Sequence, residues 1–317
     1  MRKWTPGLAF IIVLTVSNMA LACDLCAIYR SDEAKESNPG FNVGVFEQFT
    51  HFGTLQKSGR EIPNTADQYM DSSITQFFAG YQFERFGVQA NIPYIYRSFR
   101  RTGPEGIDKD AEAGLGDATL MGNYRAYERL TPDTIFIWTL LGGVKFPTGS
   151  ADRLKEEKNE SEPAPGFPES GIHGHDLALG SGSYDGIVGT TAVFHWQRFF
   201  TAAGAQYTVR TRGAYGYRYA NDLSWNIKPG YFLYVSHEST LGLQFAVTGE
   251  TKGKDTFKGE KAVDTAITSV FLGPEFSYTW KEKLSADLGA EYPVILHNTS
   301  LQAVPDYKLR AAINWRF

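Results

Sequence analysis

The sequence predicts an all-β fold: a transmembrane, antiparallel, up-and-down β-barrel of about twelve strands, preceded by a cleaved signal peptide. Three observations support this fold class. Polar and apolar residues alternate along many segments, the connections between these segments alternate in length, and aromatic residues make up 14% of the chain. Residues 307–317 show the alternation best, with Leu309 and Ile313 on one face and Lys308 and Arg310 on the other. In a closed barrel such a strand meets lipid on one face and a wet lumen on the other.

The same period of two indicates the individual strands. We expect them at residues 41–53, 69–83, 86–99, 114–127, 134–147, 184–196, 199–212, 222–235, 240–251, 264–280, 284–295 and 306–317. A soluble β-sandwich is the alternative. It is disfavoured because both faces of these strands are too mixed to fill a dry core.

The connections between the predicted strands are alternately tight and long. The tight ones are 84–85, 128–132, 197–198, 236–239 and 281–282, and the long polar ones are 54–68, 100–113, 148–183, 213–221, 252–263 and 297–304. Short periplasmic turns and long extracellular loops are typical of outer-membrane barrels. The pattern therefore places both termini in the periplasm and the protein in the bacterial outer membrane, with membrane lipid around it.

Three regions follow from this interpretation. Residues 1–22 are expected to be a signal peptide, because a basic start precedes a short apolar run and the small-residue site Ala20-Leu21-Ala22. An uncleaved anchor is the alternative, but the run is short of the roughly 20 residues that a spanning helix needs. Residues 23–40 form a periplasmic tail, and residues 41–317 form the barrel. The net charge of -4 and the lack of a basic motif give no support for nucleic-acid binding.

Charged residues are predicted to line the lumen. Asp117, Lys145 and Asp185 fall at the same height on neighbouring strands, so we expect them to cluster near the extracellular rim. A cation between two carboxylates can filter solutes or anchor the loop 148–183; a salt bridge that only pins the strand register is the alternative. We include Arg125 in this lumen constriction. Further inward charges are Lys228, Glu275, Asp287, Glu291 and Arg310.

Three motifs in the middle of the chain resemble a known family. They are Gly114-Leu115-Gly116-Asp117, Val144-Lys145-Phe146-Pro147-Thr148-Gly149 and Leu179-Gly180-Ser181-Gly182-Ser183-Tyr184-Asp185. The sequence is similar here to the outer-membrane family named after the meta-pathway of phenol degradation. The resemblance implies a barrel that moves or binds small, often aromatic, compounds. The chain departs from the family pattern in its cysteine pair and in the very polar loop after Gly149.

The two cysteines, Cys23 and Cys26, lie just beyond the predicted cleavage site. Their spacing suits a small disulfide, or a metal or redox pair, and Cys23 is also a candidate for lipidation. Haem attachment is excluded because Ala27, not His, follows the second cysteine. Two thiolates do not complete a structural zinc site, so a metal role requires further ligands or a periplasmic partner of the tail.

The run His173-Gly174-His175-Asp176 offers imidazole and carboxylate ligands for a metal ion. It lies in the loop that we place outside the cell, so His173 and His175 are expected to belong to a solvated, glycine-rich loop instead. The tail could bring the cysteines to them only by threading the lumen.

The sequence therefore predicts a channel or transporter that passes or binds a small solute or ion through a narrow charged lumen, with no cofactor. An inert scaffold, in which the tail or the loop 150–182 binds a partner protein or a metal, is the first alternative. An outer-membrane hydrolase is the second. It is disfavoured because His237 and Ser239 fall in a predicted periplasmic turn, and His297 and Ser300 in a loop with no evident oxyanion donor.

Overall fold

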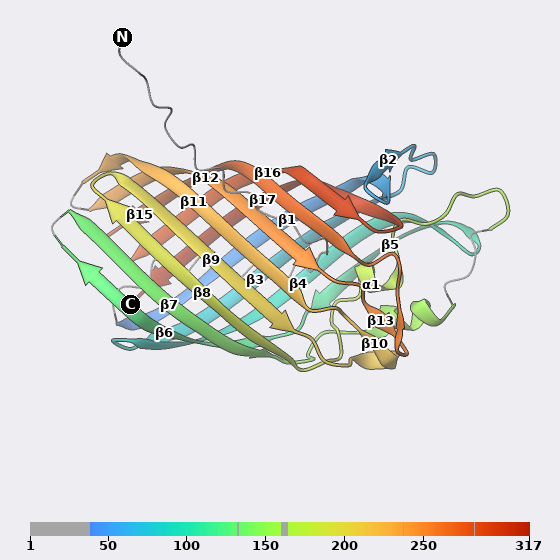
Figure 1. The fold of residues 1–317 in the computed structure, drawn as a ribbon, viewed down its shortest axis with the longest axis horizontal. Coiled ribbons are helices and arrows are strands. Elements are labelled where there is room, and N and C mark those ends of the chain that lie inside the picture. Colours follow the sequence, from blue (N-terminus) through green and yellow to red (C-terminus); the bar gives the residue numbers. More distant parts are fainter. Residues whose placement is uncertain (1–38, 132, 160–163, 237, 282) are drawn as a thin grey trace, which may run out of the picture.

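The computed structural model describes residues 39–131, 133–159, 164–236, 238–281 and 283–317. Twelve antiparallel strands form a closed, tilted barrel, because β17 pairs with β1 along its length, from Asn42 opposite Arg316 to Lys57 opposite Leu301 (Figure 1). The barrel strands are β1 (Gly40–Lys57), β3 (Tyr69–Gln82), β4 (Phe86–Gly103), β6 (Thr119–Leu130), β7 (Thr134–Lys145), β8 (Asp185–Trp196), β9 (Phe199–Val209), β11 (Asp222–Val235), β12 (Ser239–Lys252), β15 (Ile267–Trp280), β16 (Leu284–Asn298) and β17 (Leu301–Arg316). The predicted fold class is confirmed. The signal peptide and the cysteine tail lie outside the described residues.

Alternation along each strand sorts side chains between the two surfaces of the wall. On β17, Leu309 and Ile313 are exposed on the outside, whereas Lys308 and Arg310 are buried on the lumen side. Lipid therefore contacts apolar side chains, and the charged ones find partners inside the barrel.

One predicted strand and two predicted loops were wrong. Residues 297–304 are not a long loop, because β16 runs to Asn298 and β17 begins at Leu301. Residues 100–113 are not a polar loop, because β4 continues to Gly103 and forms a hairpin with β5 (Gly106–Leu115). The predicted strand 114–127 is accordingly split: its first two residues belong to β5, residues 116–118 form a short connection, and the rest belong to β6. Beyond the membrane both faces of a hairpin meet water, so this charged segment needs no apolar alternation and escaped detection.

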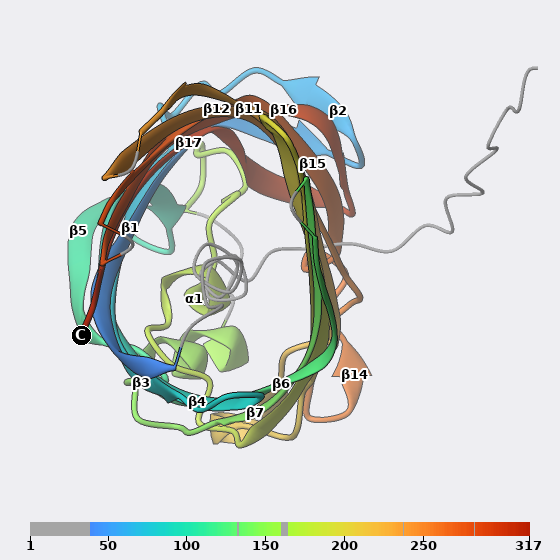
Figure 2. The same ribbon diagram turned by 90° about the vertical axis from the view of Figure 1, so that its left-hand side faces the viewer.

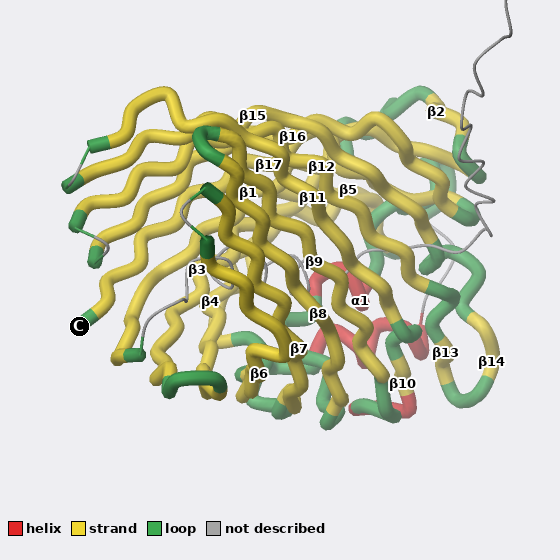
Figure 3. Tube along the Cα trace, turned by 60° about the vertical axis from the view of Figure 1, so that its left-hand side comes forward, coloured by secondary structure: helices red, strands yellow, loops and turns green. Residues whose placement is uncertain are grey.

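Smaller elements gather at the end of the barrel that carries the long connections, called here the long-loop end. β2 (Arg60–Ile62) folds back and pairs antiparallel with the end of β1, and β10 (Tyr217–Arg218), β13 (Thr256–Phe257) and β14 (Glu260–Lys261) form a separate small sheet. A single helical turn, η4 (Ala214–Gly216), precedes β10. Figure 3 shows the short turns at the opposite end. No helix within the described part of the chain is long and apolar enough to cross a membrane.

The longest connection folds back into the barrel. It contains η3 (Asp152–Asn159) and α1 (Gly174–Leu177), and Figure 2, which looks along the barrel, shows α1 inside the ring of strands. Ile172 and Leu177 pack with Phe52, Met70 and Phe99 of the wall, and Leu179 packs with Phe46, Ile74 and Ile95. The expectation of a solvated loop around His173 and His175 was wrong, because these apolar contacts draw residues 172–183 into the barrel. We call residues 172–183 the inserted segment.

Candidate lumen constriction

Three glycines from the three motifs meet at one point of the long-loop end. A Cβ on Gly149 would lie 2.7 Å from the Leu179 carbonyl oxygen and 2.9 Å from the Gly116 backbone, and one on Gly180 would lie 2.5 Å from the Gly149 oxygen. These neighbours are backbone atoms, which cannot swing away as a flexible side chain can. Glycine is therefore required for three chain segments to approach so closely. The contact positions Asp117 and Ser181 beside the end of β7.

Asp117, Lys145 and Asp185 lie together at this point, as the strand spacing predicted. Lys145 Nζ is 2.5 Å from Asp117 Oδ2 and 2.9 Å from Asp185 Oδ2, and its other partner is Ser181 Oγ. Asp117 also accepts hydrogen bonds from the backbone amides of Ser181 (2.9 Å) and Gly149 (3.1 Å). Both carboxylate side chains have 0% exposure, so a fully paired ionic cluster fastens the inserted segment to the wall.

The ionic cluster continues around the barrel through residues that the sequence analysis did not single out. Arg210 donates to Asp185 at 3.2 Å and to Asp222 at 2.8 Å. Asp222 lies opposite Lys252 in the β11–β12 register, and Lys252 in turn donates to Asp255 at 2.7 Å. We call Asp117, Lys145, Asp185, Arg210, Asp222, Lys252 and Asp255 the charge belt. Most of these residues lie at, or just beyond, the strand termini at the long-loop end. That position is visible in the sequence and could have identified them.

Arg125 does not belong to this constriction. It pairs with Glu128 at 3.0 Å, toward the short turn that joins β6 and β7. The long arginine side chain faces the lumen as predicted, but it lies near the opposite end of its strand from Asp117. The other inward charges form two buried pairs, Lys228 with Glu275 at 2.8 Å and Glu291 with Arg310 at 2.6 Å; Asp287 is half-buried.

A small cavity remains between the inserted segment and the two sides of the barrel. Its volume is about 70 Å³. Apolar side chains such as Phe52 and Met70 line one part, and belt residues such as Lys145 and Arg210 line another. Arg97 reaches across from β4 and donates to the carbonyl oxygens of Asp176 (2.6 Å) and Ala178 (2.9 Å), which holds α1 over the cavity.

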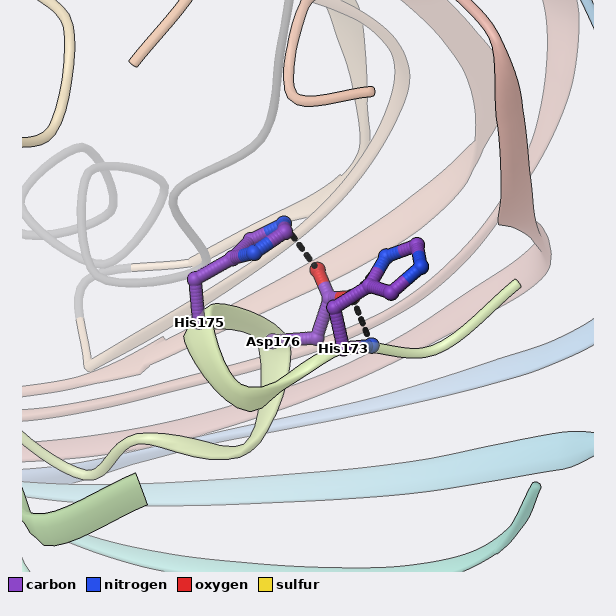
Figure 4. Close-up of side chains that lie close together, drawn as sticks. All are labelled: His173, His175 and Asp176. Atoms are coloured by element: carbon purple, nitrogen blue, oxygen red, sulfur yellow. Dashed lines mark hydrogen bonds and ion pairs between the residues drawn. The ribbon is translucent and has the colours of Figure 1, made fainter. Parts of the chain in front are cut away.

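His173, His175 and Asp176 form a compact group on α1 and at its N-terminus (Figure 4). His175 Nε2 is 3.4 Å from Asp176 Oδ1, and His175 Nδ1 is 3.0 Å from Glu157 Oε1 on η3. Burial opposes protonation of His175, but the carboxylates of Asp176 and Glu157 outweigh it and raise the pKa of this imidazole to about 10. Burial likewise favours neutral Glu157, yet the facing His175 charge lowers the pKa of that carboxyl to about 2. Without a metal ion, the pair is an ion pair at neutral pH.

The cysteines predicted as a metal, redox or disulfide pair, Cys23 and Cys26, lie outside the described residues. Their role stays a prediction. A periplasmic partner of the tail likewise stays a prediction.

No protein-family model matches the sequence, so the family resemblance also stays a prediction. No curated protein matches it either. Among solved structures, the chain is similar to an outer membrane channel from Pseudomonas putida F1, with a TM-score of 0.63 and 15% identity over 90% of this chain and 99% of that one. The translocator domain of the autotransporter NalP from Neisseria meningitidis matches at a TM-score of 0.42 and 12% identity, over 91% and 92% of the two chains. The chain thus has the fold of a bacterial outer-membrane β-barrel.

Proposed function

We propose that this barrel is an outer-membrane channel that passes or binds a small solute through a narrow lumen, with its long-loop end facing outward. Asp117, Lys145 and Asp185 then belong to the outer constriction, together with the segment 172–183. The observation that carries the proposal is the seating of this segment inside the barrel, where it lines a cavity of about 70 Å³. Sites for drug-sized ligands enclose roughly 300–1,000 Å³. We infer that a solute of that size enters this cavity only when the segment shifts.

The lining of the cavity supports a class of solute. One side offers apolar and aromatic surface from Phe52 and Met70, and the other offers charged groups from Lys145 and Arg210. A small amphipathic molecule, with an apolar body and one polar group, satisfies both sides. Such a solute agrees with the small, often aromatic, compounds that the family resemblance implies. The similar fold of a known outer membrane channel supports conduction rather than an inert scaffold.

The test is single-channel conductance with reversal potential, measured on the purified mature protein in planar bilayers at two salt concentrations. We expect discrete conductance steps with an ion preference that changes in the variant Asp117→Asn/Lys145→Gln. The matched control is Lys228→Gln/Glu275→Gln, which removes a buried ion pair elsewhere in the lumen. Equal effects of the two variants would contradict the constriction, and silence from a correctly folded barrel would favour the scaffold.

A further inference from the structure

We propose that His173, His175, Asp176 and Asp264 bind one divalent transition-metal ion of the zinc class, which ties the inserted segment to the barrel wall. The first three residues belong to the segment, whereas Asp264 precedes β15 on the wall. The inference goes beyond channel function and is tested by binding, without conductance. It therefore stands or falls separately from the proposed function.

The spacing of the polar atoms supports a tetrahedral site. Zinc bonds to nitrogen and oxygen of about 2.0–2.2 Å place tetrahedral ligand atoms about 3.3–3.6 Å apart. His175 Nε2 lies 3.4 Å from Asp176 Oδ1, and His173 Nδ1 lies 3.3 Å from Asp264 Oδ2 and 3.9 Å from Asp176 Oδ2. One ligand atom from each of His173, His175 and Asp176 falls within 4.8 Å of the others, and Asp264 adjoins this group through His173.

A neighbouring carboxylate orients one of the imidazoles. Glu157 Oε1 is 3.0 Å from His175 Nδ1, and this contact leaves Nε2 turned toward Asp176. Metal-binding histidines in proteins characteristically donate their other ring N–H to a carboxylate in this way, which fixes the tautomer and strengthens the ligand. Glu157 and His175 side chains are 5% and 6% exposed, so the arrangement is held by packing and not by a mobile surface.

The composition of the site indicates the class of ion. Two imidazoles with carboxylates suit zinc and its first-row neighbours, whereas calcium and magnesium take oxygen ligands alone. Three carboxylates, those of Glu157, Asp176 and Asp264, face two imidazoles that become neutral when they bind metal. The resulting negative charge attracts a divalent cation.

The experiment titrates Zn²⁺ into chelator-treated mature protein by calorimetry, and Co²⁺ for its absorption spectrum. The Cys23→Ser/Cys26→Ser variant serves as the parent, because the tail thiols are competing ligands. We expect one ion per barrel and a Co²⁺ spectrum without a thiolate band. His173→Ala and His175→Ala should each weaken binding at least about tenfold, and Glu157→Gln, which changes only the orienting carboxylate, should weaken it by about 10–100-fold.

The matched control is His195→Ala, a histidine on β8 that contacts Phe200 and Phe232 away from this group. It should bind Zn²⁺ like its parent. Each variant is checked for heat-modifiable migration, and if His175→Ala does not fold, His173→Ala carries the test. Absence of binding to the folded parent would overturn the proposal, as would unchanged binding in a folded His173→Ala/His175→Ala variant.

Discussion

The two sides of the lumen hold the inserted segment by different means. The side formed by β1, β3 and β4 presents buried apolar residues, including Phe46, Phe52 and Phe99, to Ile172, Leu177 and Leu179. The side formed by the ends of β6 to β12 carries the charge belt, and two of its members, Asp117 and Lys145, contact Ser181. Apolar contact is tolerant of small shifts, whereas a buried ion pair has one arrangement in which every charge is satisfied. The segment is thus held by packing on one side and placed by charge on the other.

The largest expected effect comes from breaking the charged side. Lys145→Met leaves Asp117 and Asp185 buried with their shared cation removed, which should cost about 3–5 kcal/mol of stability. Equilibrium unfolding of the barrel in lipid vesicles measures the loss. The control is Lys281→Met at the pair with Glu238, whose side chains are 48% and 66% exposed; it should cost less than about 1 kcal/mol. If the two variants lost similar amounts of unfolding free energy, the buried cluster would contribute no more to stability than an exposed ion pair, against this account.

A smaller loss should follow from separating the three glycine-bearing segments. In Gly149→Ala the added methyl group meets backbone atoms at 2.7 Å and 2.9 Å, so the segments must move apart at a cost of about 1–3 kcal/mol. The same unfolding measurement applies. Gly142→Ala is the control, since nothing lies within 4 Å of its Cβ position. If Gly149→Ala were as stable as wild type, close approach of the glycines would not explain the motifs.

A change in pH should act on the ion pair between η3 and α1. The raised pKa of His175 gives a stabilisation that is complete below about 6.5 and is lost as the pH rises through about 10. The lowered pKa of Glu157 gives a stabilisation that is complete above about 4.5 and is lost as the pH falls through about 2. Protection of the segment from protease, with chelator present, should therefore be greatest between about pH 4.5 and 6.5.

The variant His175→Gln is the control for this pH profile. It removes the titrating imidazole, so the decline of protection above pH 6.5 should disappear. A profile that kept its shape in His175→Gln would assign the pH dependence to other groups.

Much of the barrel could be predicted from the sequence because its rules are local. Alternation along residues 307–317 and the alternating connection lengths predicted the strands. Asp117, Lys145 and Asp185 occupy lumen-facing positions close to neighbouring strand ends, and this arrangement predicted their cluster. The hairpin of β4 and β5 escaped because charged residues in water carry no face preference. The docking of the inserted segment inside the barrel was not predicted, for a different reason.

The segment's large apolar residues, Ile172, Leu177 and Leu179, are few and lie among polar and small residues, which is a composition typical of loops. Their partners, which include Phe52, Met70 and Phe99, lie on inward strand faces whose other residues are mostly polar. The mixed strand faces indicated a wet lumen, and they do line one, but the apolar positions on β1, β3 and β4 are gathered where the segment docks. Recognising this required the spatial arrangement of three strands, which a single sequence does not supply.

The most direct test of the account releases the segment and measures conductance. Leu177 has 0% exposure in the apolar cluster, so Leu177→Asp buries an unpaired charge and should expel α1 from the lumen. The control is Phe167→Asp in the same connection, where the side chain is 42% exposed. We predict that single-channel conductance rises in Leu177→Asp and stays at the wild-type value in Phe167→Asp. Unchanged conductance in a folded Leu177→Asp barrel whose segment has become protease-sensitive would contradict the central claim that this segment narrows the channel.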